Sequence, residues 1–102
     1  MIPLKVSLAD AKKQLKEQSE FPFTTMMKHG NMTVEYYAPK DVDLQTPHIQ
    51  DEIYVIASGT SVFNRNGEFT DCKKGDVLFV PAGVEHRFET FSEDFATWVI
   101  FY

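Results

Sequence analysis

The residues best suited to chemistry in this chain occur in two short segments. The first is TPHIQDEIYVIASG, residues 46–59, in which His48, Gln50 and Glu52 occupy alternate positions just before an apolar run. Alternate residues of a β-strand point to the same face of a sheet. The spacing therefore predicts that an imidazole, an amide and a carboxylate share one face, and that Tyr54 continues this face along the strand.

If this face is buried, Glu52 needs a compensating partner, because an unpaired carboxylate in an apolar interior costs several kcal/mol. A divalent metal ion is one such partner, since imidazole nitrogens and carboxylate oxygens are common ligands of these ions. A hydrogen-bonded network that contains a cation is another. The residues alone leave both interpretations open.

The second segment is GDVLFVPAGVEHRFET, residues 75–90. Its Pro81-Ala82-Gly83 run predicts a tight turn between two strands. After this turn, His86, Phe88 and Thr90 alternate with residues that can face solvent. The pattern predicts that His86 points into the interior, where it can meet the polar face of the first segment.

The elements that must position these residues are mostly strands. About eight short runs rich in aromatic and β-branched residues are separated by turns at roughly ten-residue spacing, which is typical of a sandwich or barrel. Asn66-Gly67, between two extended runs, is a strong hairpin signal. Residues 7–18 predict one short helix, with Ser7 as its cap. We therefore expect a single all-β domain, residues 1–102, with one peripheral helix.

Composition and charge exclude several classes of protein. The net charge is −5 and no long basic run occurs, so a nucleic-acid partner is not expected. No window of about 18 apolar residues predicts a transmembrane helix, and the N-terminus lacks the features of a secretory signal. A cytoplasmic protein without a membrane partner is expected. Cys72 is the only cysteine, which excludes an internal disulfide.

Three other polar residues receive structural interpretations. His29 lies at a predicted turn and is expected to face solvent. Asp51 is out of phase with Glu52 and should face outward. Cys72 ends a predicted hairpin strand, where packing or exposure is expected rather than a role as a nucleophile.

The second segment resembles the second motif of the cupin superfamily, whose pattern is glycine, five residues, proline, one residue, glycine, two residues, histidine. Gly75, Pro81, Gly83 and His86 match this motif without gaps. The asparagine that usually closes the motif is replaced here by Thr90. The match is therefore nearly complete.

The first segment resembles the first cupin motif, in which two histidines one residue apart precede a glutamate and then a glycine. His48 matches the second histidine, Glu52 the glutamate and Gly59 the glycine. Thr46 occupies the place of the first histidine, and Lys40 that of the opening glycine. The chain thus resembles a small single-domain cupin whose first motif lacks one histidine.

This resemblance, close over residues 40–102, implies a small antiparallel β-barrel of the jelly-roll type with a short N-terminal helix. It implies that His48, Glu52 and His86 are metal ligands, with Gln50 as a candidate fourth ligand. Fe, Mn, Ni, Co and Zn all accept such ligands. Small cupins commonly pair, so a homodimer is also expected.

The cupin fold hosts many activities, so the expected function stays broad. One hypothesis is a metal-dependent dioxygenase- or isomerase-type enzyme on a small polar substrate, with Gln50 or Tyr54 as the candidate catalytic residue that orients it. The alternative is a non-catalytic module that binds or senses a sugar or an acid without metal, and a third is a structural domain without a ligand. Four residues are predicted to line the cavity: Thr46, Phe88, Thr90 and Trp98.

Overall fold

The computed structural model describes residues 2–18 and 20–102. Within these residues, helix α1 (Leu8–Gln18) precedes eight strands. The strands are β1 (Phe23–His29), β2 (Met32–Tyr37), β3 (Glu52–Ser58), β4 (Thr60–Arg65), β5 (Glu68–Lys73), β6 (Val77–Val80), β7 (His86–Phe91) and β8 (Ala96–Phe101). The predicted β-rich fold with one short N-terminal helix is confirmed.

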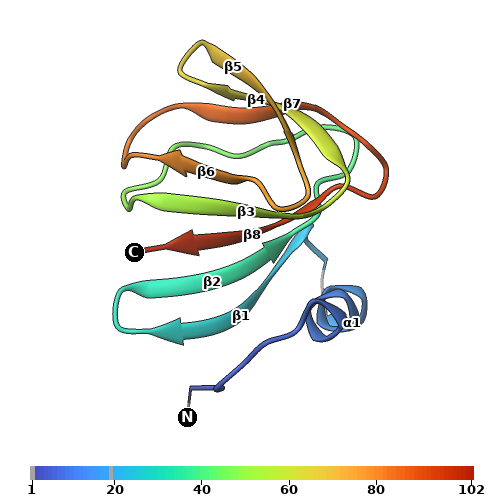
Figure 1. Cartoon of the computed structure of the whole chain (residues 1–102). Coiled ribbons are helices and arrows are strands. Elements are labelled where there is room, and N and C mark those ends of the chain that lie inside the picture. Colours follow the sequence, from blue (N-terminus) through green and yellow to red (C-terminus); the bar gives the residue numbers. More distant parts are fainter. Residues whose placement is uncertain (1, 19) are drawn as a thin grey trace.

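The strands form two antiparallel sheets (Figure 1). The larger sheet has the order β1-β2-β8-β3-β6, and the smaller has the order β5-β4-β7. Strands distant in the sequence become neighbours, because β8 pairs with β2 on one side and with β3 on the other. Among the described residues no ladder of backbone hydrogen bonds joins the two sheets. The predicted antiparallel architecture is therefore present, whereas a hydrogen-bonded closed barrel is not.

The two sheets are linked instead by a side chain from the loop between β2 and β3. Residues 38–51 contain no strand, and Asp43 in this loop is buried. Its carboxylate accepts a hydrogen bond from the Tyr37 hydroxyl of β2 at 2.6 Å and another from the Phe88 backbone N–H of β7 at 2.9 Å. The buried carboxylate of Asp43 thus connects β2 of the larger sheet to β7 of the smaller sheet by hydrogen bonds.

The main core lies between the sheets and consists of their inward-facing residues. Tyr54 and Ile56 point inward from β3, as strand alternation requires, and Phe63 and Phe88 meet them from the smaller sheet. The rings of Tyr54 and Phe88 pack edge to face, with centroids 5.0 Å apart. Cys72 is buried in the same cluster, where burial raises the pKa of its thiol. Its packing role agrees with the sequence interpretation.

Helix α1 packs on the outer face of the larger sheet, beside β1 and β2 (Figure 1). It begins at the predicted cap, where Ser7 Oγ accepts a hydrogen bond from the Asp10 backbone N–H at 3.0 Å. Ala11 is buried in a small second cluster with Tyr36 and Trp98. This cluster fixes the helix to the sheet. No helix among the described residues is long and apolar enough to cross a membrane.

The turn between β3 and β4 requires glycine at position 59. The φ angle of Gly59 is +74°, in the left-handed region that residues other than glycine rarely adopt. A Cβ atom at this position would lie 2.7 Å from Phe95 Cα and 2.5 Å from Ser92 Oγ. The glycine of the first motif thus allows the β3–β4 turn to pack directly on the β7–β8 turn.

Candidate metal centre

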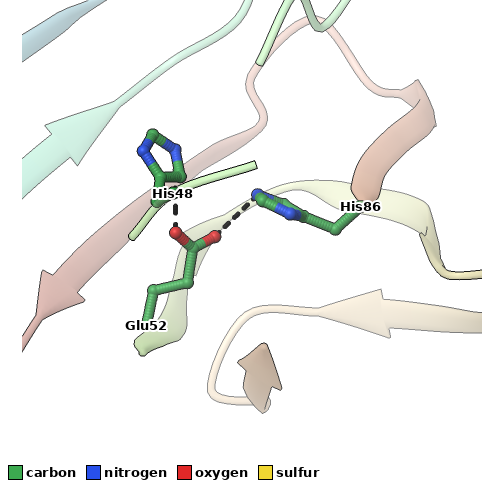
Figure 2. A group of neighbouring side chains, drawn as sticks. All are labelled: His48, Glu52 and His86. Carbon is green, nitrogen blue, oxygen red and sulfur yellow. Dashed lines mark ion pairs between the residues drawn. The ribbon is translucent and has the colours of Figure 1, made fainter. Parts of the chain in front are cut away.

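Three residues distant in the sequence meet in space (Figure 2). Glu52 begins β3, His86 begins β7, and His48 lies in the loop before β3. One ligand atom from each residue lies within 4.8 Å of the other two. The side chains of Glu52 and His86 are 1% exposed, whereas that of His48 is 35% exposed. Glu52 and His86 are therefore enclosed, and His48 is the member of the cluster whose side chain reaches the surface.

The potential ligand atoms of this cluster lack ordinary hydrogen-bond partners. His86 Nε2 lies 2.7 Å from Glu52 Oε1, and His48 Nε2 lies 3.7 Å from Glu52 Oε2. Despite these approaches, three buried side-chain atoms of the described residues have no partner with hydrogen-bond geometry, namely His48 Nε2, Glu52 Oε2 and His86 Nε2. Buried polar atoms are nearly always hydrogen-bonded. All three exceptions lie in one place, and a bound cation would satisfy each of them.

The second ring nitrogen of His86 indicates how its Nε2 is used. Nδ1 lies 3.0 Å from the carbonyl oxygen of Val84, which can only accept, so Nδ1 carries a proton. In the neutral ring, Nε2 then presents a lone pair to Glu52, which is also an acceptor. Two acceptors at 2.7 Å require a proton or a metal ion between them. A backbone carbonyl on the other ring nitrogen is also a usual partner of a metal-ligating histidine.

Without a metal ion, a proton on His86 satisfies this contact. Burial by itself lowers the pKa of His86, but the contacts with Glu52 and with the Val84 carbonyl outweigh burial and raise the pKa above its usual value of 6.5. The metal-free protein is thus expected to hold an imidazolium–carboxylate pair. Because a ligating histidine must be neutral, a metal ion and this proton compete for the same nitrogen.

Loop contacts bring the two sequence segments together. The carbonyl of His48 accepts a hydrogen bond from the backbone N–H of Gly83 at 2.7 Å. Asp51 Oδ1 accepts another from the backbone N–H of Ala82 at 2.8 Å. Both donors belong to the predicted tight turn between β6 and β7. Although alternation predicts an outward Asp51, its side chain thus fixes the first segment to the turn that precedes His86.

The first segment becomes a strand later than its sequence predicts. The predicted strand begins near residue 46, whereas β3 begins at Glu52. The pairing of β3 with β6 starts at Glu52 and Val80, and the next residue, Pro81, has no N–H with which to extend the ladder. His48 therefore lies in a loop. Its ring still faces the cluster, packed edge-on against Phe101 with centroids 4.7 Å apart.

A chain of hydrogen bonds extends from Glu52 to the loop before β3. The Tyr54 hydroxyl lies 2.6 Å from Glu52 Oε1 and 2.9 Å from Gln45 Oε1. Gln45 Nε2 in turn donates to Asp43 Oδ2 at 3.0 Å, and the Tyr37 hydroxyl donates to the other oxygen of Asp43. Burial and the charge of Glu52 raise the pKa of Tyr54 well above its usual value, so Tyr54 stays a neutral donor. This network fixes the orientation of the central carboxylate.

A pocket of about 850 Å³ opens beside the cluster. His48, Thr46 and Gln50 line it from the loop, and Val99 and Phe101 line it from β8. His48 therefore connects the buried cluster to a space large enough for a small molecule. Thr46, which stands where the family motif has a histidine, is exposed and lies on the lining of this pocket.

The two candidate catalytic residues lie in different environments. Gln50 lines the pocket, but its amide nitrogen donates a hydrogen bond to the carbonyl oxygen of Asn31. Its role as a fourth ligand therefore depends on its Oε1 atom and stays a prediction. Tyr54 is fully buried and is not part of the pocket lining. The expectation that Tyr54 orients a substrate is wrong, because its hydroxyl is buried between two protein acceptors, Glu52 Oε1 at 2.6 Å and Gln45 Oε1 at 2.9 Å.

Two aromatic residues predicted to line the cavity lie elsewhere. Phe88 is fully buried in the main core, between the two sheets. Trp98 packs in the cluster beneath α1, because alternation along β8 places it on the opposite face from Val99. An aromatic residue in a strand can face either side, and the sequence prediction chose the wrong side for Trp98.

Thr90 also lies outside the pocket, because β7 contains a β-bulge. Phe63 of β4 pairs with Phe88, but the preceding residue, Val62, pairs with Thr90, which leaves Glu89 as an extra residue on β7. A bulge reverses the inward and outward alternation of the residues that follow it. Thr90 is consequently exposed, and the expectation that it faces the interior is wrong.

Three polar residues of the site were missed by the sequence reasoning. Asp43 and Gln45 complete the network behind Glu52, and Glu35 of β2 lines the pocket. Glu35 alternates with Thr33 and Tyr37 on the inner face of β2, so the strand pattern contained a signal for it. The two loop residues follow no periodic pattern, and their burial arises only from the fold.

The fold and the site agree with the architecture expected of a cupin. Two antiparallel sheets face each other, and a His–Glu–His cluster is formed by one loop residue and the first residues of two strands. Residues 33–102 match the family model described as a cupin domain. The chain therefore belongs to the cupin family. An uncharacterized protein of Streptomyces coelicolor is 38% identical over 81 residues, a region that covers 78% of this chain and 77% of that protein.

Solved structures show the same fold at low sequence identity. KdgF from Halomonas sp. superposes with a TM-score of 0.71 and 17% identity, covering 82% of each chain. A cupin-2 domain containing protein from Shewanella frigidimarina gives a TM-score of 0.70 and 17% identity, covering 93% of this chain and 91% of that one. At such identities the likeness extends to the fold alone.

Proposed function

We propose that this protein binds one divalent transition-metal ion through His48, Glu52 and His86, and that the ion acts on a small molecule held in the adjacent pocket. The observation that carries this proposal is the coincidence of the three unpartnered buried atoms with the three potential ligand atoms. If these atoms belonged to an ordinary hydrogen-bonded part of the core, each would be expected to have a hydrogen-bond partner.

The residues present fit such an ion. Two imidazoles and one carboxylate form the facial triad of non-heme Fe(II) sites, which also suits Mn, Ni, Co or Zn. Metal–ligand distances of about 2.1 Å place neighbouring ligand atoms about 3 Å apart. In the cluster, the two histidine nitrogens lie 2.7 and 3.7 Å from the two oxygens of Glu52, and all three ligand atoms lie within 4.8 Å of one another. When bound, the ion supplies a Lewis acid or an oxygen-activating centre with open positions for a substrate.

The surrounding residues prepare the ligands. The Val84 carbonyl holds His86 in the tautomer whose Nε2 is free to ligate. The Tyr54 hydroxyl, at 2.6 Å, holds one oxygen of Glu52 and leaves Oε2 without a partner. Phe101 fixes the ring of His48 from the pocket side. Each ligand is thus oriented before an ion arrives, which reduces the ordering cost of binding.

A second candidate function is a metal-free binding module, favoured by a different observation. Glu52 already has a partner in the imidazolium of His86, at 2.7 Å with both side chains 1% exposed. Such a pair compensates the buried carboxylate without metal. In this case the pocket would bind its ligand reversibly and catalyse no reaction.

Equilibrium dialysis separates the two candidates. Untagged protein, first stripped with a chelator, is dialysed against Mn²⁺, Fe²⁺, Co²⁺, Ni²⁺ or Zn²⁺, and bound metal is measured by elemental analysis. We expect about one ion per chain for the parent and for His29→Ala, because His29 is exposed and lies outside the cluster. We expect at least a hundredfold loss of affinity for His86→Ala, which removes one of only three ligands. A parent that stays empty with every ion contradicts the metal site and favours the binding module.

A further inference from the structure

Glu35 is a carboxylate on an otherwise largely apolar pocket wall. It lies on the inner face of β2, where its neighbours across the strands are Val99 of β8 and Thr25 of β1. Val99 and Phe101 line the same pocket and are buried. Glu35 is not part of the metal-binding cluster. Its carboxylate is therefore placed to meet a ligand and not to hold the ion.

The entrance of this pocket exposes apolar side chains. Phe21 is 63% exposed, Leu44 80% and Ile49 96%, and all three line the pocket. Large apolar side chains gathered at a cavity mouth are typical of a ligand-binding site. A ligand with an apolar body would cover them.

In the metal-free protein, the described carboxylates that line the pocket outnumber the lysines and arginines by two to one. Among the described lining residues the carboxylates are Glu20 and Glu35, and the one lysine or arginine is Lys40, which is exposed. No arginine from the described residues is available there to bind a phosphate or a carboxylate in the usual bidentate manner. An anionic group near Glu35 would meet a like charge in a partly desolvated space.

The surroundings of Glu35 also leave its charge poorly compensated. Burial and then the charge of Glu52 raise the pKa of Glu35, and a hydrogen bond with Thr25 lowers it only partly. A ligand hydroxyl or ammonium group that donates to Glu35 would supply the missing partner.

We infer that the pocket takes a largely apolar small molecule that carries a hydroxyl or ammonium donor, and that Glu35 both binds this donor and rejects anionic ligands. This assignment rests on the proposed function only in placing the ligand beside the metal centre, because recognition by Glu35 itself requires no metal. It replaces the small polar, sugar or acid ligands that the sequence suggests with a chemically narrower class.

The test compares three probes that share a phenyl ring and differ at the end of the chain: 2-phenylethylamine, 2-phenylethanol and 3-phenylpropionate. Each is titrated into metal-free protein at neutral pH, and dissociation constants are measured from amide chemical shifts. Because the ammonium group can donate a hydrogen bond to the charged Glu35 and the carboxylate cannot, we expect the amine to bind at least about tenfold more tightly than the carboxylate. The alcohol should lie between them, and shifts should map to β2, β8 and residues 42–50.

Glu35→Gln keeps the shape of the side chain and removes its charge. We expect this variant to reduce the preference for the amine over the carboxylate to less than about threefold. Loss of the Glu35 charge weakens the hydrogen bond to the amine and removes the repulsion of the carboxylate. Glu35→Thr, which introduces a residue with high strand propensity, provides a second variant if the first is poorly folded. Glu93→Gln, on the β7–β8 turn outside this pocket, is the charge-matched control and should keep the parent preference.

Equal binding of the amine and the carboxylate by the parent would overturn the inference, and so would a preference that survives both substitutions at Glu35. The result is independent of the metal site, because the titrations contain a chelator. A protein that shows the predicted preference but fails the dialysis experiment keeps this inference and loses the metal centre. The reverse outcome keeps the metal centre and loses the inference.

Discussion

Replacing Asp43 with Asn tests whether one buried carboxylate fixes the loop that carries His48. Asp43 is 1% exposed. Its Oδ1 accepts hydrogen bonds from the Tyr37 hydroxyl at 2.6 Å and the Gln45 backbone N–H at 3.1 Å. Its Oδ2 accepts from Gln45 Nε2 at 3.0 Å and from the Phe88 backbone N–H at 2.9 Å. All four partners are donors, so the site requires two acceptor atoms.

Asparagine offers only one acceptor oxygen, and its NH₂ group must face one pair of donors. If the oxygen keeps the position of Oδ1, the amide opposes Gln45 Nε2 and the Phe88 N–H. Each lost hydrogen bond to a charged group costs about 1.5–3 kcal/mol. Since the Gln45 side chain can rotate to relieve part of this loss, we expect Asp43→Asn to lower the free energy of unfolding by about 3–5 kcal/mol.

The assay is equilibrium unfolding in urea with a chelator present, monitored by Trp98 fluorescence. Asp71→Asn is the matched control, because Asp71 is exposed on β5 and should change stability by less than about 0.5 kcal/mol. Hydrogen exchange of the Phe88 amide, whose acceptor is lost, should accelerate in Asp43→Asn. A loss below about 1 kcal/mol in Asp43→Asn, with the Phe88 amide still protected, would refute the reasoning that this carboxylate links the sheets.

Three further predictions concern the cluster and its scaffold. Tyr54→Phe removes the hydroxyl that holds Glu52 and should weaken metal binding by about 10–100-fold in a chelator competition titration; an unchanged affinity would show that this hydroxyl does not orient the ligand. Gly59→Ala should lower the free energy of unfolding in urea by about 2–4 kcal/mol, because the backbone is strained and the new Cβ overlaps the β7–β8 turn. Gly30→Ala should cost only about 1–2 kcal/mol, because Gly30 has a positive φ but no atom within 4 Å of the new Cβ. Equal losses would argue against the close packing of the β3–β4 turn. Folding raises the pKa of His86 above 6.5. In the metal-free protein the ion pair of His86 with Glu52 therefore stabilises the fold fully below about pH 6.5, and this stabilisation is lost as the pH rises through the folded-state pKa. The free energy of unfolding should fall over that range in the parent and not in His86→Gln, and a rise in the parent would contradict the assignment.

Strand periodicity and turn chemistry predicted much of this fold. The cap at Ser7 and the hairpin at Asn66-Gly67 depend on local residues alone, and the structure contains both. The resemblance to the two cupin motifs also implied that His48, Glu52 and His86 meet. Local signals sufficed for Glu52 and His86, which begin strands. They did not suffice for His48, which the pattern placed in a strand and the structure places in the loop before β3.

The errors arose where tertiary contacts override the local pattern. The extra residue Glu89 in the β-bulge of β7 reverses the orientation of Thr90, and the residue types in this strand do not indicate the bulge. Trp98 faces α1 because the helix covers that side of β8, which the strand sequence alone does not specify. Asp43 lies in a loop without periodicity, and its burial depends on donors from Tyr37 and Phe88 that only the folded chain brings together.

The most direct test of the central claim is an anomalous difference map from crystals grown with Mn²⁺. We predict one peak within bonding distance, about 2.0–2.3 Å, of His48 Nε2, His86 Nε2 and the Glu52 carboxylate, with the pocket side of the ion open. Crystals of His86→Ala under the same conditions should lack this peak. A parent map without density between these residues, with His86 still paired directly to Glu52, would contradict the account and leave the cluster as a metal-free ion pair.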